Sequence, residues 1–181
     1  MHRIETKRPN CYQLQPKKFE DNRGSFVKTF HEEIFQDLGL DTNFAEEYYS
    51  FSYQNVVRGL HFQLPPHEHI KIVYCVQGAV KDVVVDLRVN SPTYGQFEIF
   101  DLSAEKANLI YIPSGLAHGF AVMSETAIMM YKVSTVYHPE SDTGIRYDSL
   151  GIPWEIDKPI ISQRDSSFIP FVEFQSPFIY P

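Results

Sequence analysis

The chain has 181 residues and a mass of 21.0 kDa, a size that suits one hydrophobic core, so we expect residues 1–181 to form a single domain. Its formal net charge of −7 argues against general binding to nucleic acid or to anionic membranes, although one basic pocket for a phosphorylated small molecule remains compatible with it. Two cysteines outside any metal or redox spacing, Cys11 and Cys75, and the lack of an apolar stretch of transmembrane length predict a cytoplasmic protein with reduced thiols.

Short strands separated by turns dominate the sequence, and helical signals are scarce. One helix is predicted at residues 31–39, where acidic residues lead, apolar residues share one side and Gly39 ends the run. β-branched and aromatic runs then predict strands at residues 70–76, 79–89, 97–102, 109–112, 119–122 and 128–136. Strands of this length and spacing predict an all-β antiparallel sandwich or barrel. After Trp154, prolines and polar residues predict a tail, at about residues 155–181, that packs on the barrel or on a partner subunit.

Four histidines lie beside strand-like or Pro/Gly-rich segments and could converge inside a barrel: His61, His67, His69 and His118. The HxH spacing of His67 and His69 places two imidazoles on one face of a strand, and PSGLAH, which ends at His118, resembles a cupin motif that often supplies a third metal ligand. Lys71, however, follows where a metal cupin has an acidic ligand, and its charge would repel a divalent ion. We therefore favour a cupin-like fold without a metal.

Proton transfer is the other interpretation of these residues. Arg58 and His61 would face opposite sides of a regular strand, unless Gly59 bends the strand and brings both side chains into one pocket. Lys71 on a neighbouring element and Tyr131 in an apolar strand would add an electrophile and an acid. For each residue taken alone, a packed structural role stays open.

Several longer motifs carry a more specific signal. They are DNRGSF (21–26), VVRGLHFQLPPHEHIK (56–71), GAVKDVVVDLRVNSPTYG (78–95), IPSGLAHGF (112–120), MYKVSTVYHPESDTGI (130–145) and ISQRD (161–165). In this order they resemble the motifs of the dTDP-4-dehydrorhamnose 3,5-epimerases, over about residues 10–170. The resemblance implies a cupin-type jelly-roll barrel of antiparallel strands with one or two short helices, and an isomerase that needs no cofactor or metal.

The same resemblance implies a reaction and its catalytic residues. The reaction would invert C3, C5 or both of a nucleoside-diphosphate 4-keto-6-deoxy sugar, as in the synthesis of dTDP-L-rhamnose and of deoxysugars for surface polysaccharides. His61 matches the general base, and Asp165 the carboxylate that orients it. Tyr131 matches the acid on the opposite face of the sugar, and Lys71 the cation near the C4 oxygen, where an enolate develops.

The resemblance also implies how the substrate is held. Arg58 and His118 match groups that hold the pyrophosphate, Arg23 a nucleotide contact, and Tyr137 a ring that stacks on the base. Family members are homodimers in which N-terminal strands of one subunit reach the other subunit's site, and residues 23–30 have an alternation that suits such a strand. Two mild departures from the family pattern are Arg164 for a lysine and Asp142 for a glutamate.

Three stronger departures concern the substrate. Lys28 stands where the family usually has a glutamate that contacts the nucleobase, and a lysine, which only donates hydrogen bonds, would suit the N3 acceptor of cytosine. A 5-epimerase of a CDP-linked 4-keto-3,6-dideoxy sugar is therefore an alternative. Glu46 and Tyr48 replace amides expected near the sugar, which leaves the inverted carbon open. Outside this class, a metal-dependent cupin enzyme and a non-catalytic sugar-nucleotide-binding cupin also stay open.

Overall fold

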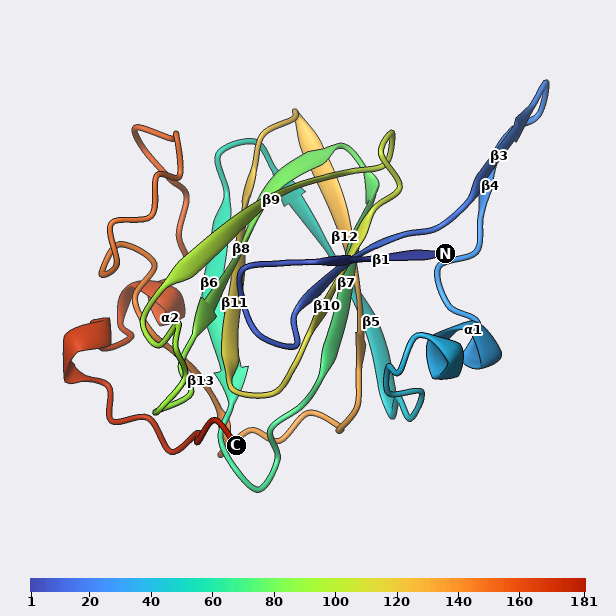
Figure 1. Ribbon diagram of the computed structural model, residues 1–181. Coiled ribbons are helices and arrows are strands. Elements are labelled where there is room, and N and C mark those ends of the chain that lie inside the picture. The colour runs from blue at the N-terminus through green and yellow to red at the C-terminus, as the bar shows by residue number, and fades with distance from the viewer.

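Two antiparallel β-sheets face each other in the computed structural model of the chain, which describes residues 1–181 (Figure 1). The strands are β1 (His2–Glu5), β2 (Tyr12–Gln15), β3 (Lys18–Asp21), β4 (Gly24–Val27), β5 (Glu46–Tyr53), β6 (Val57–Gln63), β7 (Lys71–Gln77), β8 (Ala79–Asp86), β9 (Phe97–Ser103), β10 (Leu109–Ile112), β11 (Leu116–Val122), β12 (Thr126–Val133) and β13 (Asp142–Gly144). One sheet has the order β1-β2-β10-β7-β12-β5, and the other has the order β13-β6-β11-β8-β9. The predicted all-β jelly roll of antiparallel strands is confirmed.

Short helices accompany the strands: α1 (Glu32–Asp37), α2 (Gln163–Ser166) and a 3₁₀ turn, η1 (Phe171–Glu173). The helix predicted at residues 31–39 corresponds to α1, which is followed by Gly39 in the left-handed region at φ +70. No helix has the length and apolar character needed to cross a membrane.

Three apolar clusters form the core, one between the sheets and one on the outer face of each sheet. The inner cluster combines Val84 on β8 with Tyr131 on β12, so it joins both sheets. The outer face of the five-stranded sheet is covered by the C-terminal part of the chain through Trp154 and Phe178. The outer face of the six-stranded sheet is covered by α1 through Phe35. The sheets are thus supported from both sides, which holds their inward-facing polar side chains in fixed positions.

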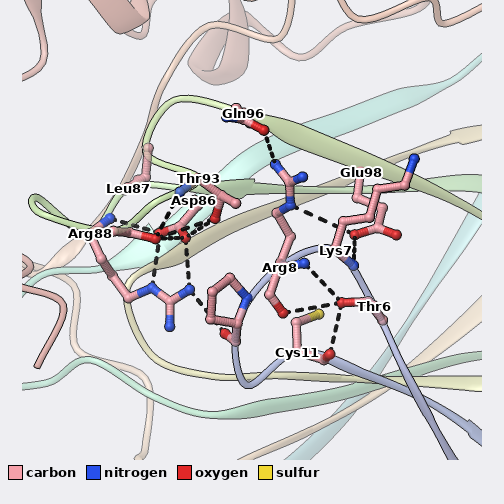
Figure 2. Close-up of polar contacts among 12 residues, drawn as sticks. Thr6, Lys7, Arg8, Cys11, Asp86, Leu87, Arg88, Thr93, Gln96 and Glu98 are labelled. Carbon is pink, nitrogen blue, oxygen red and sulfur yellow. Dashed lines mark hydrogen bonds and ion pairs between the residues drawn. The ribbon is translucent and has the colours of Figure 1, made fainter.

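A buried ion pair anchors both ends of the chain to the barrel, and Figure 2 shows its two residues, Asp86 and Arg88, beside the N-terminal segment. The fully buried Asp86 carboxylate accepts hydrogen bonds from the Arg88 guanidinium at 2.7 and 2.9 Å and from two hydroxyls of the following loop. The same guanidinium donates to the Pro9 carbonyl at 3.0 Å and lies over the Tyr180 ring. Asp86 and Arg88 therefore fix the N-terminal and C-terminal segments at the end of β8.

Two facing glycines allow β6 and β11 to approach closely and bend. His118 pairs with His61 and Phe120 pairs with Arg58, so β6 has one residue more than β11 between these pairs. Gly59 adopts φ +131, and a Cβ there would lie 2.6 Å from Gly119 Cα. The bend that the sequence allowed at Gly59 is present, and Arg58 and His61 both line the interior cavity.

Candidate active site

A cavity of about 330 Å³ lies between the two sheets. His61 reaches it from β6 in the five-stranded sheet, whereas Lys71 on β7 and Tyr131 on β12 reach it from the six-stranded sheet. The predicted base and the predicted acid therefore belong to opposite walls. A sugar ring between these walls would have one of them on each face.

Asp165 fixes the orientation of the His61 imidazole. Its Oδ1 lies 2.9 Å from His61 Nε2, and its Oδ2 accepts the Gly59 backbone N–H at 3.0 Å. Asp165 belongs to α2, where its own N–H donates to the N-cap hydroxyl of Ser162. Because Nε2 is occupied, Nδ1 is the ring nitrogen left to accept a proton. The structure thus brings together two predicted catalytic residues that lie far apart in sequence.

Burial and hydrogen bonding set the protonation of this pair. Burial lowers the pKa of His61 below its usual 6.5, although the hydrogen bond and charge of Asp165 oppose this effect. Burial alone would raise the pKa of Asp165, but hydrogen bonds from His61 and from the Gly59 N–H bring it below its usual value. At neutral pH the carboxylate is charged and the imidazole is neutral, which is the form that a general base needs.

Lys71 places a buried ammonium group at the cavity wall. The residue is 6% exposed, and its Nζ donates to the His61 backbone carbonyl at 3.3 Å. Burial lowers the pKa of Lys71 to about 8, and the charges of Asp142 and Asp82 oppose the shift. The side chain is therefore mostly protonated at pH 7 and can donate a hydrogen bond to a developing oxyanion.

Tyr131 is enclosed by rings and by one hydroxyl. Its ring stacks on Tyr48, with centroids 4.7 Å apart and an interplanar angle of 14°, and meets His118 edge-on at 6.1 Å. Its hydroxyl oxygen lies 3.2 Å from Ser50 Oγ. Burial raises the pKa of Tyr131 above its usual 10, so the phenol is protonated at neutral pH and can act as an acid.

Two further side chains of the cavity wall are fixed by partners of their own. Arg58 Nε donates to Ser52 Oγ at 2.9 Å, and its Nη2 donates to the Phe51 carbonyl at 3.2 Å. His118 Nε2 lies 2.7 Å from a carboxylate oxygen of the fully buried Asp82, whose pKa is raised by burial although His118 opposes this. A guanidinium and an imidazole held in this way suit a phosphate ligand.

The more exposed part of the cavity wall contains the remaining predicted contacts. The Glu46 carboxylate accepts the Tyr137 backbone N–H at 2.7 Å, and 57% of Tyr137 is exposed. Arg164 pairs with Asp142 at 2.6 Å, and its guanidinium lies over the Phe168 ring. The Glu46 contact holds the loop that presents the Tyr137 ring.

Two predicted substrate-binding residues lie outside this cavity. Arg23 belongs to the turn between β3 and β4, and Lys28 directly follows β4; Figure 1 shows this hairpin projecting away from the barrel. The Arg23 side chain is 86% exposed and pairs with Asp21 at 2.6 Å, while Lys28 is exposed and forms no ion pair. Within one chain these residues do not join the others, and their contact with a substrate stays a prediction.

The histidines of the metal alternative do not gather around one point. His67 stacks on His138 with a centroid separation of 3.6 Å, and its Nδ1 lies 3.1 Å from Ser141 Oγ. His69 lines the cavity, and burial lowers its pKa to about 3. No group of three or more His, Cys, Asp or Glu side chains converges as a ligand set. A reaction without metal or cofactor stays a prediction.

Three side chains that hold the cavity residues were not predicted: Ser50, Ser52 and Asp82. Ser50 and Ser52 alternate along β5 with the exposed aromatic residues Phe51 and Tyr53. This period of two is typical of a β-strand and could have placed both serines on its inward face. Asp82 is a carboxylate beside the valines in the middle of β8, and a charge in such a place indicates a buried partner.

Comparison with known proteins identifies one family. Residues 5–173 match the profile described as dTDP-4-dehydrorhamnose 3,5-epimerase. The protein of that name from Shigella flexneri is 38% identical over 96% of this chain and 97% of its own, and the one from Methanothermobacter thermautotrophicus is 41% identical over 94% of each. The crystal structure of dTDP-6-deoxy-D-glucose-3,5-epimerase from Legionella pneumophila, in complex with dTDP-4-keto-L-rhamnose, superposes with a TM-score of 0.95. It is 33% identical, and the match covers 99% of this chain and 98% of that one.

Proposed function

Because the chain belongs to the dTDP-4-dehydrorhamnose 3,5-epimerase family, we propose that it inverts C3, C5 or both of a dTDP-linked 4-keto-6-deoxy sugar. The observation that carries this proposal is the His61–Asp165 pair on one wall of a cavity whose other wall presents the buried Tyr131 hydroxyl. Inversion at carbon needs a base and an acid on opposite faces of the sugar, and these two groups meet that need.

The first half-reaction removes a proton next to the ketone. C3 and C5 of the sugar are acidic only because the C4 carbonyl delocalises the resulting charge. Nδ1 of neutral His61 takes the proton, and the Asp165 carboxylate stabilises the imidazolium that forms. The ammonium of Lys71 stabilises the enolate oxygen at C4, a contribution that is largest in a buried site.

The second half-reaction returns a proton from the other side. Tyr131 donates its phenolic proton to the carbanion carbon, and the configuration at that carbon is inverted. A phenol is suited to this step because its raised pKa keeps it protonated until a strongly basic carbanion faces it. Asp165 and the stacked Tyr48 each hold one member of the acid–base pair in place.

The nucleotide would be held at the polar part of the cavity. Arg58 and His118 bind the pyrophosphate, and this local basic site explains how a chain of net charge −7 can bind an anionic ligand. Tyr137, whose ring is exposed at the cavity wall, stacks on the nucleobase. Arg164, Asp142 and Glu46 shape the same region of the wall.

Lys28 bears on which nucleobase the substrate carries, and this can be tested directly. Lysine donates to an acceptor, such as N3 of cytosine, but cannot accept the N3–H of thymine. A competition experiment measured by calorimetry compares the affinities of the protein for dTDP and for CDP. Tighter binding of CDP would favour the CDP-linked alternative, and tighter binding of dTDP supports the main proposal.

We further propose a homodimer in which the β3–β4 hairpin of each subunit reaches the cavity of the other. Phe19 and Phe26 on this hairpin are 50% and 62% exposed. The edge strand β5 also exposes aromatic side chains on its outer face: Tyr49, Phe51 and Tyr53. Exposed aromatic patches of this kind are typical of protein interfaces. Strand exchange would bring Arg23 and Lys28 to a nucleotide in the partner's cavity.

Mixed dimers test this arrangement. Arg23→Ala and His61→Ala proteins are purified separately, unfolded, mixed and refolded, so that half of the dimers are mixed. If Arg23 acts across the interface, each mixed dimer contains one intact site, and activity rises to roughly a quarter of the wild-type value. A monomeric mass in solution, or activity equal to the mean of the two parents, would contradict the exchange.

We place the protein in the cytoplasm as part of the same proposal. Cys11 and Cys75 are both buried and unpaired, as is usual in a reducing compartment. Burial raises the pKa of both thiols, so they are poor nucleophiles and take no part in the reaction. Fractionation of producing cells, followed by immunodetection, checks the compartment.

Product analysis tests the epimerase activity itself. NMR after incubation with a dTDP-linked 4-keto-6-deoxy sugar shows whether a centre has been inverted. We expect inversion by the wild-type protein and a loss of at least roughly 100-fold in His61→Ala, the lower range for removal of a general base. Full activity after dialysis against a chelator separates this mechanism from a metal-dependent reaction. A protein that binds the sugar nucleotide without converting it would be the non-catalytic alternative.

A further inference from the structure

The buried hydroxyl of Tyr131 has one route for its proton other than the substrate. Tyr131 is 7% exposed, its ring is covered by Tyr48 and His118, and its hydroxyl makes a single hydrogen bond, at 3.2 Å to Ser50 Oγ. After the phenol gives its proton to carbon, a phenolate is left in a place that disfavours charge. That phenolate must regain a proton before the group can act again.

The proposed reaction makes this requirement strict. Each inversion takes one proton from Tyr131, so inversion at two carbons takes two protons while the sugar stays in the cavity. The proton that His61 removes is on the opposite wall and does not return to Tyr131 directly. A separate path for the acid's proton is therefore needed between the two inversions.

We propose that Ser50 is this path and acts as the proton relay of Tyr131. The inference rests on the proposed epimerase function. Ser50 donates its Oγ–H to the Tyr131 phenolate and at the same time takes a proton from a water molecule. The hydroxide that remains is neutralised by the proton that the His61 imidazolium releases to solvent. After one complete inversion, Ser50 and Tyr131 are therefore back in their starting protonation states.

Ser50 is placed for this task because its Oγ is the hydrogen-bond partner of the phenol. A serine hydroxyl donates and accepts at once, as a relay must. Ser50 is half-buried and lines the cavity from β5, the edge strand of its sheet, whereas Tyr131 is buried. His118 meets the Tyr131 ring edge-on and is bonded through Nε2 to Asp82.

Ser50→Ala removes the relay and leaves Tyr131 its own proton. In rapid-quench experiments with excess substrate, we expect the first inversion per enzyme molecule at nearly the wild-type rate. Later inversions should be slower by roughly tenfold or more, within the range for a lost proton-transfer group. If the wild-type protein inverts two carbons, the singly inverted sugar should accumulate in this variant. Ser50→Thr keeps a hydroxyl and should restore the wild-type time course.

Ser52→Ala is the matched control on the same face of β5. It removes the hydrogen-bond partner of Arg58 rather than that of Tyr131. It should therefore raise KM, but the first inversion should not be faster than the later ones and the singly inverted sugar should not accumulate. A Ser50→Ala protein whose first inversion is as slow as the later ones, or whose time course equals the wild-type one, would overturn the relay. A wild-type protein that inverts no carbon would instead overturn the proposed function.

Discussion

At the scale of single residues, two reactive side chains that face the cavity are each held by a second side chain. Asp165 holds His61 through Nε2, and Ser52 holds Arg58 through Nε. Such contacts limit the rotation of the reactive groups before any substrate arrives, so that less order has to be created during the reaction. The Asp165 contact also reaches the Gly59 N–H, which links the orientation of the base to the bend of β6.

Asp165→Asn tests how much the charge of this contact contributes. The amide is close in size to the carboxylate, but it cannot stabilise an imidazolium and can force the other tautomer on His61. We expect kcat to fall by roughly 10²–10⁴-fold with a small change in KM, measured by steady-state kinetics. Asp148→Asn, an exposed partner of Arg146 outside the cavity, should keep the wild-type kcat. An Asp165→Asn enzyme with normal kcat would remove the carboxylate from the mechanism.

The pH dependence of kcat/KM, which reports the ionisation of the free enzyme, follows from the two pKa shifts in the cavity. The base must be neutral, and burial lowers the pKa of His61 below 6.5, so activity should persist on the acid side of that value. Lys71 must be protonated, and it loses its proton as the pH rises through about 8. We expect kcat/KM to fall above pH 8 by about tenfold for each pH unit.

Lys71→Arg is the control for the alkaline limb. A guanidinium stays charged at every pH of the assay, so the fall above pH 8 should disappear in this variant even if its kcat is lower. If activity falls above pH 8 in the same way in Lys71→Arg and in the wild-type protein, a group other than Lys71 causes the fall.

At the scale of elements, β5 and the β6–β11 pair set the geometry of the cavity. The inward face of β5 presents four side chains that contact residues of the cavity wall. Glu46 contacts Tyr137, Tyr48 and Ser50 both contact Tyr131, and Ser52 contacts Arg58. One strand thus positions three groups together: the Tyr137 ring proposed to stack on the base, the proposed acid Tyr131, and Arg58, which is proposed to bind the pyrophosphate. Its alternation of inward and outward residues follows from the period of two in a β-strand.

Gly119→Ala tests the close approach of β6 and β11. A Cβ at this position would lie 2.7 Å from the Arg58 carbonyl oxygen and 3.0 Å from a Leu60 methyl group, so the strands would have to separate. We expect the free energy of unfolding in urea to fall by about 2–3 kcal/mol, a typical cost of overpacking. Gly151→Ala is the control: it has no neighbour within 4 Å, and only its positive φ should cost about 1 kcal/mol. Equal losses in both variants would contradict a packing role for Gly119.

The strands that follow a simple pattern were predictable from the sequence, and those that do not were missed. The apolar run at residues 109–112 predicted β10 with its correct ends, because a fully buried strand has no polar residues to interrupt it. β5 was missed because its inward residues are polar and its outward residues are aromatic, the reverse of a strand that packs on a core. This reversal arises from the cavity on one side and an exposed face on the other.

The candidate site was predictable in its residues, but of its connections only the contact between His61 and Asp165 was implied by the resemblance. His61, Lys71, Tyr131 and the pair of Arg164 with Asp142 all line one cavity. The contacts that hold them depend on which strands pair and in which register, and local sequence patterns do not fix these. The position of Arg23 illustrates the limit, because the resemblance places it at a substrate while a single chain holds it outside the cavity.

At the scale of the whole molecule, the fold separates a rigid support from a reactive interior. Apolar clusters cover both outer faces of the sandwich, and the Asp86–Arg88 pair fixes the two chain ends at its rim. The interior between the sheets is then free to hold a base on one wall and an acid on the other. This arrangement suits the proposed inversion of carbon centres by proton transfer.

Proton transfer at His61 and Tyr131 from opposite walls is the central step of the proposed reaction. The most direct test is to incubate the sugar nucleotide in D₂O with wild-type and Tyr131→Phe protein and to follow deuterium at C3 and C5 by NMR. We expect the wild-type product to carry deuterium at each inverted carbon, and Tyr131→Phe to retain exchange at those carbons without inversion. Wild-type protein that incorporates no deuterium at either carbon, or Tyr131→Phe protein that inverts them at the wild-type rate, would contradict this mechanism.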